Sequence, residues 1–119
     1  MLSLKQQQGD SAEQDALEFL QQTGLKLISK NYNCKLGEID LIMQDGEILV
    51  FVEVRYRNSD KFGGAAASVN HQKQQKIIRS AEHYLQKNYR QPPTCRIDVV
   101  AIDKNRKIDW IKNAIEAAA

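Results

Sequence analysis

Residues 37–57 read GEIDLIMQDGEILVFVEVRYR and decide the fold of the chain. Two apolar, β-branched runs flank the dipeptide Asp45-Gly46, which tolerates the positive φ of a two-residue hairpin turn. This pattern predicts a long β-hairpin with Asp45-Gly46 as its loop. The rest of the chain is placed around the sheet that this hairpin begins.

The predicted loop determines which side chains share a face of the hairpin. Counting back from the loop places Glu38 opposite Glu53 and Asp40 opposite Phe51. Side chains alternate between the two faces of a strand, so one face carries charges and the other is apolar. The charged face comprises Glu38, Asp40, Glu53, Arg55 and Arg57, and the apolar face comprises Ile39, Leu41, Met43, Val50, Val52 and Val54.

Asp40 and Glu53 are predicted to be diagonal neighbours on the charged face, with Cα atoms roughly 7 to 8 Å apart. Like charges at this spacing repel unless a cation or a cationic side chain neutralises them. Two such carboxylates can hold one divalent cation between them, and Arg55 adds a fixed positive charge beside the pair. The hairpin therefore carries a candidate metal site.

The 119-residue chain fits one domain, residues 1–119, of which we expect 1–9 to be flexible. Its 17 Lys and Arg residues exceed its 15 Asp and Glu residues by two, so overall charge alone does not indicate a nucleic-acid partner. The sequence contains neither a signal-peptide core nor an apolar run of roughly 18 residues, so we expect a cytoplasmic protein without a membrane partner. Cys34 and Cys95 lack metal-ligand spacing and are expected to be reduced structural thiols.

The segment 11–23 has the apolar period of a helix, and Asp10-Ser-Ala-Glu resembles a capping box at its start. Glu13 also falls within the apolar stripe of this predicted helix. A carboxylate there caps the helix, reaches from the edge of the stripe to solvent, or joins a buried polar site. These interpretations differ in the direction in which the Glu13 carboxylate points.

The remaining pattern predicts a strand at 25–33, a turn-rich loop at 58–64, a helix at 66–89 and strands at 96–102 and 107–111. The Ala-rich tail from Asn113 suggests a final helical turn. The order helix, three strands, helix, two strands predicts an α/β fold, an α/β/α sandwich around a mixed sheet of about five strands. If the first helix packs on the face of Asp40 and Glu53, Glu13 joins them.

The second predicted helix carries several basic residues. Lys73 lies at the margin of its apolar stripe, from which a side chain can reach around the helix toward a site. Lys76 and Arg79 project away from the stripe as solvated charges or as phosphate contacts. His71 and His83 have no His or Cys partner at ligand spacing, which indicates structural or solvent-exposed roles.

The sequence resembles known nucleases in the order of these residues. Asp40, followed by Glu53 and Arg55 on the next strand, is close to the D…(D/E)-x-K signature of the restriction-endonuclease-like superfamily. From about Gly9 to Ile102 the chain resembles the YraN family of small endonuclease-like proteins. The motifs that carry this resemblance are GEIDLI (37–42), VFVEVR (50–55), FG (62–63), Lys73 and RIDVV (96–100).

The resemblance implies a restriction-endonuclease-like fold similar to that of archaeal Holliday junction resolvases. It implies metal-dependent cleavage of nucleic acid, with branched or structured DNA as the substrate, and it admits a homodimer. It assigns Mg²⁺ or Mn²⁺ to Asp40 and Glu53. The catalytic set it implies is Glu13, Asp40, Glu53, Arg55 and Lys73, and the nucleic-acid contacts are Arg55, Arg57, Lys73 and Lys76.

The sequence departs from the superfamily signature at Arg55, where the signature has Lys. A desolvated Lys can lose a proton and help generate a hydroxide, whereas Arg stays protonated. Arg55 can bind phosphate and stabilise negative charge, but it cannot be the general base. Two alternatives to a nuclease therefore stay open: a non-catalytic nucleic-acid-binding or protein-interaction module, and a salt-bridge lattice without a ligand.

Overall fold

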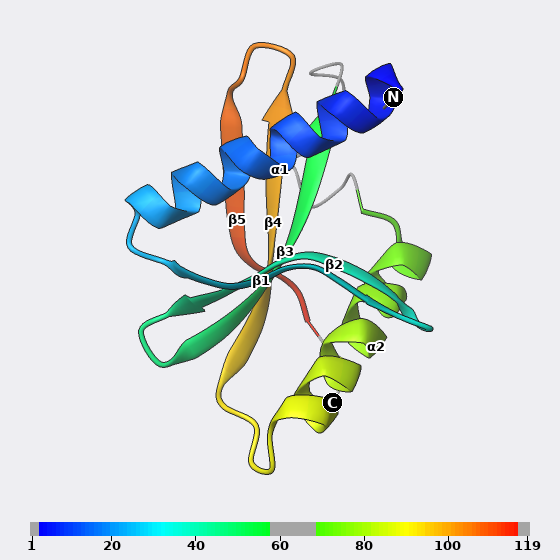
Figure 1. The fold of residues 1–119 in the computed structure, drawn as a ribbon, viewed down its shortest axis with the longest axis vertical. Coiled ribbons are helices and arrows are strands. Elements are labelled where there is room, and N and C mark those ends of the chain that lie inside the picture. The colour runs from blue at the N-terminus through cyan, green and yellow to red at the C-terminus, as the bar shows by residue number, and fades with distance from the viewer. Residues whose placement is uncertain (1–2, 58–68, 117–119) are drawn as a thin grey trace.

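The computed structural model of the chain describes residues 3–57 and 69–116 (Figure 1). It confirms the predicted α/β fold with a mixed five-stranded sheet and the predicted order of elements. Within the described residues, no helix is long and apolar enough to cross a membrane. The elements are α1 (Leu4–Gln22), β1 (Lys26–Cys34), β2 (Gly37–Asp45), β3 (Ile48–Arg57), α2 (His71–Asn88), β4 (Cys95–Asp103) and β5 (Ile108–Ile115).

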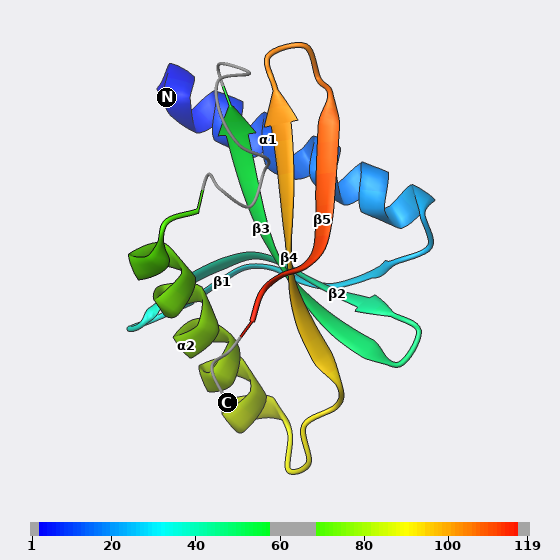
Figure 2. The same ribbon diagram turned by 180° about the vertical axis from the view of Figure 1, so that it is seen from behind.

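The five strands lie in the order β1-β2-β3-β4-β5. Neighbours are antiparallel except β3 and β4, which are parallel and are joined through α2. A parallel pair needs such a crossover, whereas antiparallel neighbours can be joined by short turns. The sheet twists strongly, so that the β1–β2 hairpin runs across the direction of β4 and β5 (Figures 1 and 2).

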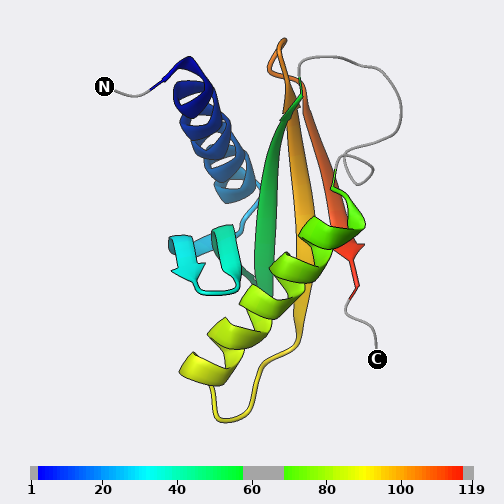
Figure 3. The ribbon, with the colours of Figure 1, turned by 90° about the vertical axis from the view of Figure 1, so that its right-hand side faces the viewer.

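The two helices cover opposite faces of the sheet, each over its own apolar core (Figure 3). The sheet is therefore buried on both faces, which is why β3 and β4 are nearly continuous apolar runs. The core under α1 includes Ala16, Leu20, Leu41, Met43, Val50, Val52 and Val100. The core under α2 includes Ile39, Ile42, Phe51, Val69, Ile77, Ala81, Tyr84 and Val99.

The placement of α1 corrects one expectation. This helix packs on the hairpin face that carries Leu41 and Val52, whereas α2 packs on the face that carries Phe51. Ile39 was predicted to share a face with Leu41, but it belongs to the α2 core and Leu41 to the α1 core, so the alternation of faces predicted for β2 does not hold at Ile39.

Helix α1 also begins earlier than predicted, at Leu4 instead of residue 11. Asp10 lies inside the helix and is not its N-cap, so the capping-box interpretation is wrong. The upstream Leu, Lys and Gln residues have good helix propensity, which lets the helix continue back through Gly9. Arg106, in the β4–β5 turn, donates hydrogen bonds to two residues of this helix, to Ser11 Oγ at 2.8 Å and to Asp15 Oδ2 at 2.7 Å.

The loop of the β2–β3 hairpin is shifted by one residue from the prediction. Asp45 pairs with Ile48, so the two loop residues are Gly46, with φ +61°, and Glu47. Arg96 from β4 lies 3.0 Å from Asp45 Oδ2 and keeps Asp45 in the strand. The loop still has two residues, so the predicted alternation of side chains is kept where the two strands are paired, from Leu41 to Asp45 and from Ile48 to Val52.

Strand β5 continues to Ile115, past the predicted end at residue 111 and in place of the predicted helical turn from Asn113. Asp98, which is fully buried, explains the extension. Its carboxylate accepts hydrogen bonds from Trp110 Nε1 at 3.0 Å and from Asn113 N at 2.9 Å, across an irregularity in the β4–β5 register. The predicted loop at 58–64, residues 66–68 of the second predicted helix and the tail at 117–119 lie outside the described residues. Helix α2 begins at His71, with Asn70 as its N-cap, so residues 69–70, which were predicted to be helical, are not.

Candidate functional site

The candidate site lies where β2 and β3 separate, a point that we call the fork. Pairing between these strands runs from the loop to Leu41 opposite Val52 and then stops. Beyond that pair, β2 stays paired with β1 and β3 stays paired with β4. Asp40 and Glu53 are the next residues along the two strands, so they face each other across the fork instead of lying diagonally in a continuous ladder.

The side chain of Asp40 replaces one backbone hydrogen bond that is lost where β2 and β3 separate. Its Oδ2 atom accepts a hydrogen bond of 2.8 Å from the backbone N–H of Val54, a donor that would otherwise bond to β2. The carboxylate of Asp40 is thus fixed by the backbone of the neighbouring strand. Its position follows directly from the geometry of the fork.

The first residue of β2 lies close to α2. Gly37 has φ +151°, a conformation that residues with a Cβ rarely adopt. A Cβ at this position would lie 3.0 Å from Ser80 Oγ and 3.6 Å from Lys76 Cβ. The glycine therefore lets β2 approach the helix and close one side of a pocket.

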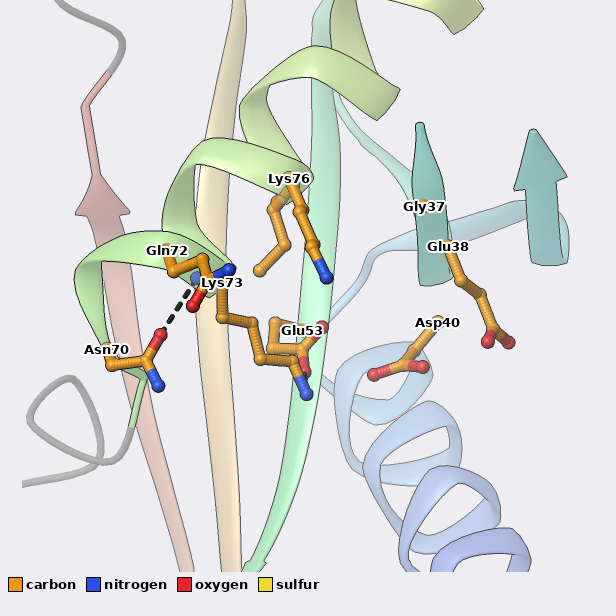
Figure 4. Close-up of a pocket in the computed structure, with 9 residues that line it drawn as sticks. Gly37, Glu38, Asp40, Glu53, Asn70, Gln72, Lys73 and Lys76 are labelled. Carbon is orange, nitrogen blue, oxygen red and sulfur yellow. Dashed lines mark hydrogen bonds and ion pairs between the residues drawn. The ribbon is translucent and has the colours of Figure 1, made fainter. Parts of the chain in front are cut away.

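This pocket has a volume of about 370 Å³ and opens between the fork and the first turns of α2 (Figure 4). Carboxylates on the strands face ammonium and amide groups on the helix. Lys73 and Lys76 extend from α2 toward Glu53, with Asp40 across from it. The lining residues are Gly37, Glu38, Asp40, Glu53, Asn70, Gln72, Lys73, Lys76 and Ile77.

Glu53 is the most buried charged group of the pocket, with 5% of its surface exposed. Its Oε1 atom lies 3.2 Å from Lys73 Nζ and 3.8 Å from Arg55 Nη1. Burial and the charge of Asp40 raise the pKa of Glu53 to about 7, and the two cations only partly oppose this shift. Burial is thus the main reason that the ionised form of Glu53 is unfavourable, with Asp40 adding to it.

Glu13 reaches the same cluster from α1. Burial raises the pKa of Glu13 to about 8, assisted by a hydrogen bond with Asp40 and by the charges of Asp40, Glu38 and Asp10. The Glu13 carboxylate thus points toward Asp40, which selects the polar-site interpretation over the capping one. The carboxylates of Glu13, Asp40 and Glu53 therefore meet at the fork.

The N-terminus of α2 forms the opposite wall of the pocket. Asn70 caps the helix by accepting a hydrogen bond of 2.8 Å from Lys73 N. The first turn contains no acidic residue, and Lys73 and Lys76 add positive charge near the positive end of the helix dipole. This wall is suited to an anion.

The structure gathers most of the residues proposed from sequence. Arg55 stands at the edge, paired with Glu53, and Glu13 approaches from the α1 side. Arg57 is half-buried near the end of β3 and does not line the pocket. The residues that line the pocket as proposed are Asp40, Glu53, Lys73 and Lys76.

Sequence reasoning did not place Gly37, Asn70 or Gln72 in the pocket. Asn70 could have been found, because Asn before a helical stripe is a typical N-cap and so marks the helix start. Gly37 could be placed only once the contact between β2 and α2 was known. Gln72 carries no signal that separates it from other polar residues on the helix.

The donor set fits a hard divalent cation. Among the described residues, no group of three or more His, Cys, Asp or Glu side chains is arranged to hold a metal ion. Mg²⁺, however, is usually bound in phosphoryl-transfer sites through one or two carboxylates together with water and substrate phosphate. Asp40 and Glu53 supply two carboxylates of this kind, facing each other across the fork.

Comparison with known proteins identifies the family. The profile described as "Uncharacterised protein family UPF0102" matches residues 12–102. A UPF0102 protein of Janthinobacterium sp. (strain Marseille) is 56% identical, with 95% of this chain and 90% of the relative covered. One from Nitrosomonas eutropha is 52% identical, with coverages of 97% and 98%. The chain therefore belongs to the uncharacterised protein family UPF0102, the YraN family that its motifs predict.

Proposed function

We propose that the chain is a divalent-metal-dependent nuclease that hydrolyses phosphodiester bonds in nucleic acid, with branched or structured DNA as its substrate class. The observation that carries this proposal is the pairing of Asp40 and buried Glu53 across the fork, opposite the lysines of α2. A phosphodiester suits this site because it is anionic and because the negative charge that develops as it reacts must be stabilised by cationic groups on both sides of it.

Stability alone does not account for Glu53. Replacing a buried ion pair by packed apolar side chains is often neutral or stabilising. The Glu53–Lys73 pair is therefore not expected to stabilise the fold more than a leucine at position 53 would. Burial next to Asp40 also makes the ionised form of Glu53 unfavourable, as its raised pKa indicates. Strongly perturbed carboxylates in a pocket are typical of functional sites.

Each residue has a distinct proposed role. Asp40 and Glu53 would hold Mg²⁺ or Mn²⁺, which when bound supplies Lewis-acid polarisation of the phosphate and activates water. Glu13, hydrogen-bonded to Asp40, orients that carboxylate and accepts a proton near the reacting centre. Lys73 and Lys76 bind the phosphate from the α2 wall.

Arg55 contributes positive charge without titrating. Its guanidinium, 3.8 Å from Glu53, can bind a phosphate oxygen and stabilise the negative charge that develops on it. The proton of the attacking water must go to another group, and Glu13 can receive it in its ionised form, which its pKa of about 8 makes available as pH rises above neutral.

The test is a cleavage assay on nicked, branched and linear DNA with Mg²⁺, Mn²⁺ or EDTA. We expect metal-dependent cleavage by the wild type that is lost in Asp40→Asn and Glu53→Gln, which keep the size of each side chain. Calorimetric titration of Mn²⁺ into the same proteins checks the first requirement. Equal residual cleavage in all three proteins would identify a contaminating nuclease and oppose the proposal.

One observation favours a second candidate, a nucleic-acid-binding module without catalysis. Arg55 replaces the lysine of the superfamily signature, and Lys73 already offsets part of the charge of Glu53. Such a module would bind DNA or RNA with an affinity that falls steeply with salt and does not depend on divalent cations. The Mn²⁺ titration separates the two candidates, because only the nuclease requires a metal.

A further inference from the structure

The exposed face of α2 carries basic residues beyond the pocket. Lys76, Arg79 and Lys87 are all exposed, and helical geometry places them within about 80° of one another around the axis. Lys76 lines the pocket, and Lys87 lies three turns farther along, a rise of about 16 Å. We call these three residues the α2 track.

The charges of the α2 track are not neutralised within the described part of the chain. None of the three residues has an ion pair there, and the helix contains a single acidic residue, Glu82. Lys76 and Arg79 are three residues apart, a spacing at which like charges are neighbours and destabilise a helix. Glu82 lies three residues after Arg79 but makes no ion pair with it, and Lys76 and Lys87 have no acidic residue three or four positions away.

From these observations we propose that the α2 track binds the sugar–phosphate backbone of the nucleic acid on one side of the cleaved bond. The inference rests on the proposed function, because the track leads directly out of the same pocket. A length of about 16 Å corresponds to about five phosphates along one strand of duplex DNA. The substrate is therefore a polymer that extends several nucleotides past the reacting phosphate.

The geometry also gives the contact a direction. The pocket is at the N-terminal end of α2, and the track runs from it toward Asn88. Tyr32 on β1 flanks this face, since its hydroxyl lies 2.6 Å from Nδ1 of His83. The polymer lies along one edge of the molecule, formed by α2 and β1, and backbone contacts of this kind position the substrate without reading its sequence.

The test compares two double variants that each remove two exposed positive charges. The track variant is Arg79→Gln with Lys87→Gln, which leaves every residue of the pocket in place. The control is Lys104→Gln with Lys107→Gln in the β4–β5 turn, at the end of the sheet away from α2 (Figure 1). Thermal melting of both variants establishes that each is folded.

Fluorescence anisotropy with a labelled 30-base-pair duplex in EDTA measures binding separately from cleavage. We expect the track variant to bind several-fold more weakly than the control at low salt. The slope of log K against log salt should become shallower by up to about 2, since roughly 0.9 counterions are released per phosphate contact. Equal affinity and slope in the two variants would overturn the proposal.

Cleavage assays with Mn²⁺ distinguish failure of this inference from failure of the proposed function. A small diester, bis(p-nitrophenyl) phosphate, needs only the pocket, so the track variant should hydrolyse it at the wild-type rate while cutting the duplex more slowly. Absence of hydrolysis of either substrate by the wild type, with track-dependent binding retained, would reject the nuclease and keep the track. Duplex cleavage that is equal in track and control variants would reject the track and keep the nuclease.

Discussion

The ammonium group of Lys73 lies 3.2 Å from Oε1 of Glu53 and joins the second helix to the third strand of the sheet. The guanidinium of Arg55, two residues away on the same strand, lies farther from that oxygen, at 3.8 Å. Among the described residues, the cation nearest to the buried carboxylate is thus a lysine from the helix. Its removal should affect the site more than removal of any other single positive charge.

Replacing Lys73 by Met should raise the pKa of Glu53 further, because the nearest neutralising charge is lost. We expect cleavage to fall by roughly 10²-fold or more, the usual effect of losing one charge-stabilising group. Single-turnover rates measure this loss. Lys73→Arg is the matched control, since it keeps the charge and should retain part of the rate; equal activity of Lys73→Met and wild type would contradict the assignment.

Two substitutions of Asp40 should separate its contribution to stability from its contribution to metal binding. Asp40→Ala removes the acceptor for Val54 N–H, which should cost about 1 kcal/mol or more of the free energy of unfolding. Asp40→Asn keeps an acceptor oxygen and relieves repulsion with Glu53, so it should be close to wild type in stability. Urea denaturation at pH 7 checks the stabilities, and both variants should lose Mn²⁺ binding in calorimetry.

The metal-free protein should become less stable as pH rises. Glu53 has a pKa of about 7 in the fold against an ordinary 4.5, so the folded protein holds this proton more tightly than the unfolded chain does. Its contribution is fully present below pH 4.5 and is lost as pH rises through about 7, a change of up to about 3 kcal/mol. Glu13 extends the trend toward pH 8.

Thermal melting in EDTA from pH 5 to pH 8.5 measures this dependence. Glu53→Gln should melt with a flatter pH profile, because it removes the titrating group. Excess Mg²⁺ or Mn²⁺ should raise the melting temperature most at the alkaline end, since a ligand that binds only the folded state stabilises it. A wild-type profile that rises with pH across this range would contradict the assignment of raised pKa values.

Arg55→Lys introduces the residue that the superfamily signature contains. We expect this variant to keep the contact with Glu53 and to retain cleavage, because a lysine can replace the positive charge at this edge. Its rate should change more steeply with pH than that of the wild type, since a partly desolvated lysine titrates and arginine does not. The pH–rate profiles of the two proteins, with Arg55→Met as the inactive reference, make the comparison.

Gly37→Ala should destabilise the fold by about 1–2 kcal/mol, because its φ of +151° is strained for any residue with a Cβ. The new methyl group would also press on Ser80 Oγ at 3.0 Å. Adding Ser80→Ala removes that contact but leaves the backbone strain, so the double variant should recover only part of the loss. Complete recovery in urea denaturation would show that crowding alone was responsible.

The elements with strong periodicity could be predicted from sequence. The α2 core stripe, including Ile77, Ala81 and Tyr84, follows from helical spacing. The juxtaposition of Asp40 and Glu53 could also be predicted, because any two-residue loop in this hairpin keeps the same alternation of faces. The local sequence pattern is sufficient to predict a contact when that contact depends only on which face of one helix or strand a residue occupies.

The features that the sequence pattern did not predict depend on contacts between residues far apart in the chain. The hairpin loop depends on Asp45, which Arg96 of β4 holds in the strand. The length of β5 depends on hydrogen bonds to buried Asp98, and these also lie outside any local window. The Glu13 carboxylate interacts with Asp40 of β2, 27 residues away in the chain, so its alternatives could be separated only in the folded chain.

The hydrogen bond between Asp40 and Val54 N–H has a consequence for judging activity in relatives of this chain. Because the backbone at the fork needs an acceptor, an aspartate here would be retained even in a protein that had stopped cutting nucleic acid. Glu53 accepts no backbone hydrogen bond of this kind among those described; its partners are the side chains of Lys73 and Arg55, and burial disfavours its ionised form. Under the proposed function, a relative with leucine or glutamine at position 53 and an unchanged Asp40 would lack a metal ligand, so position 53 is the more informative one for predicting activity.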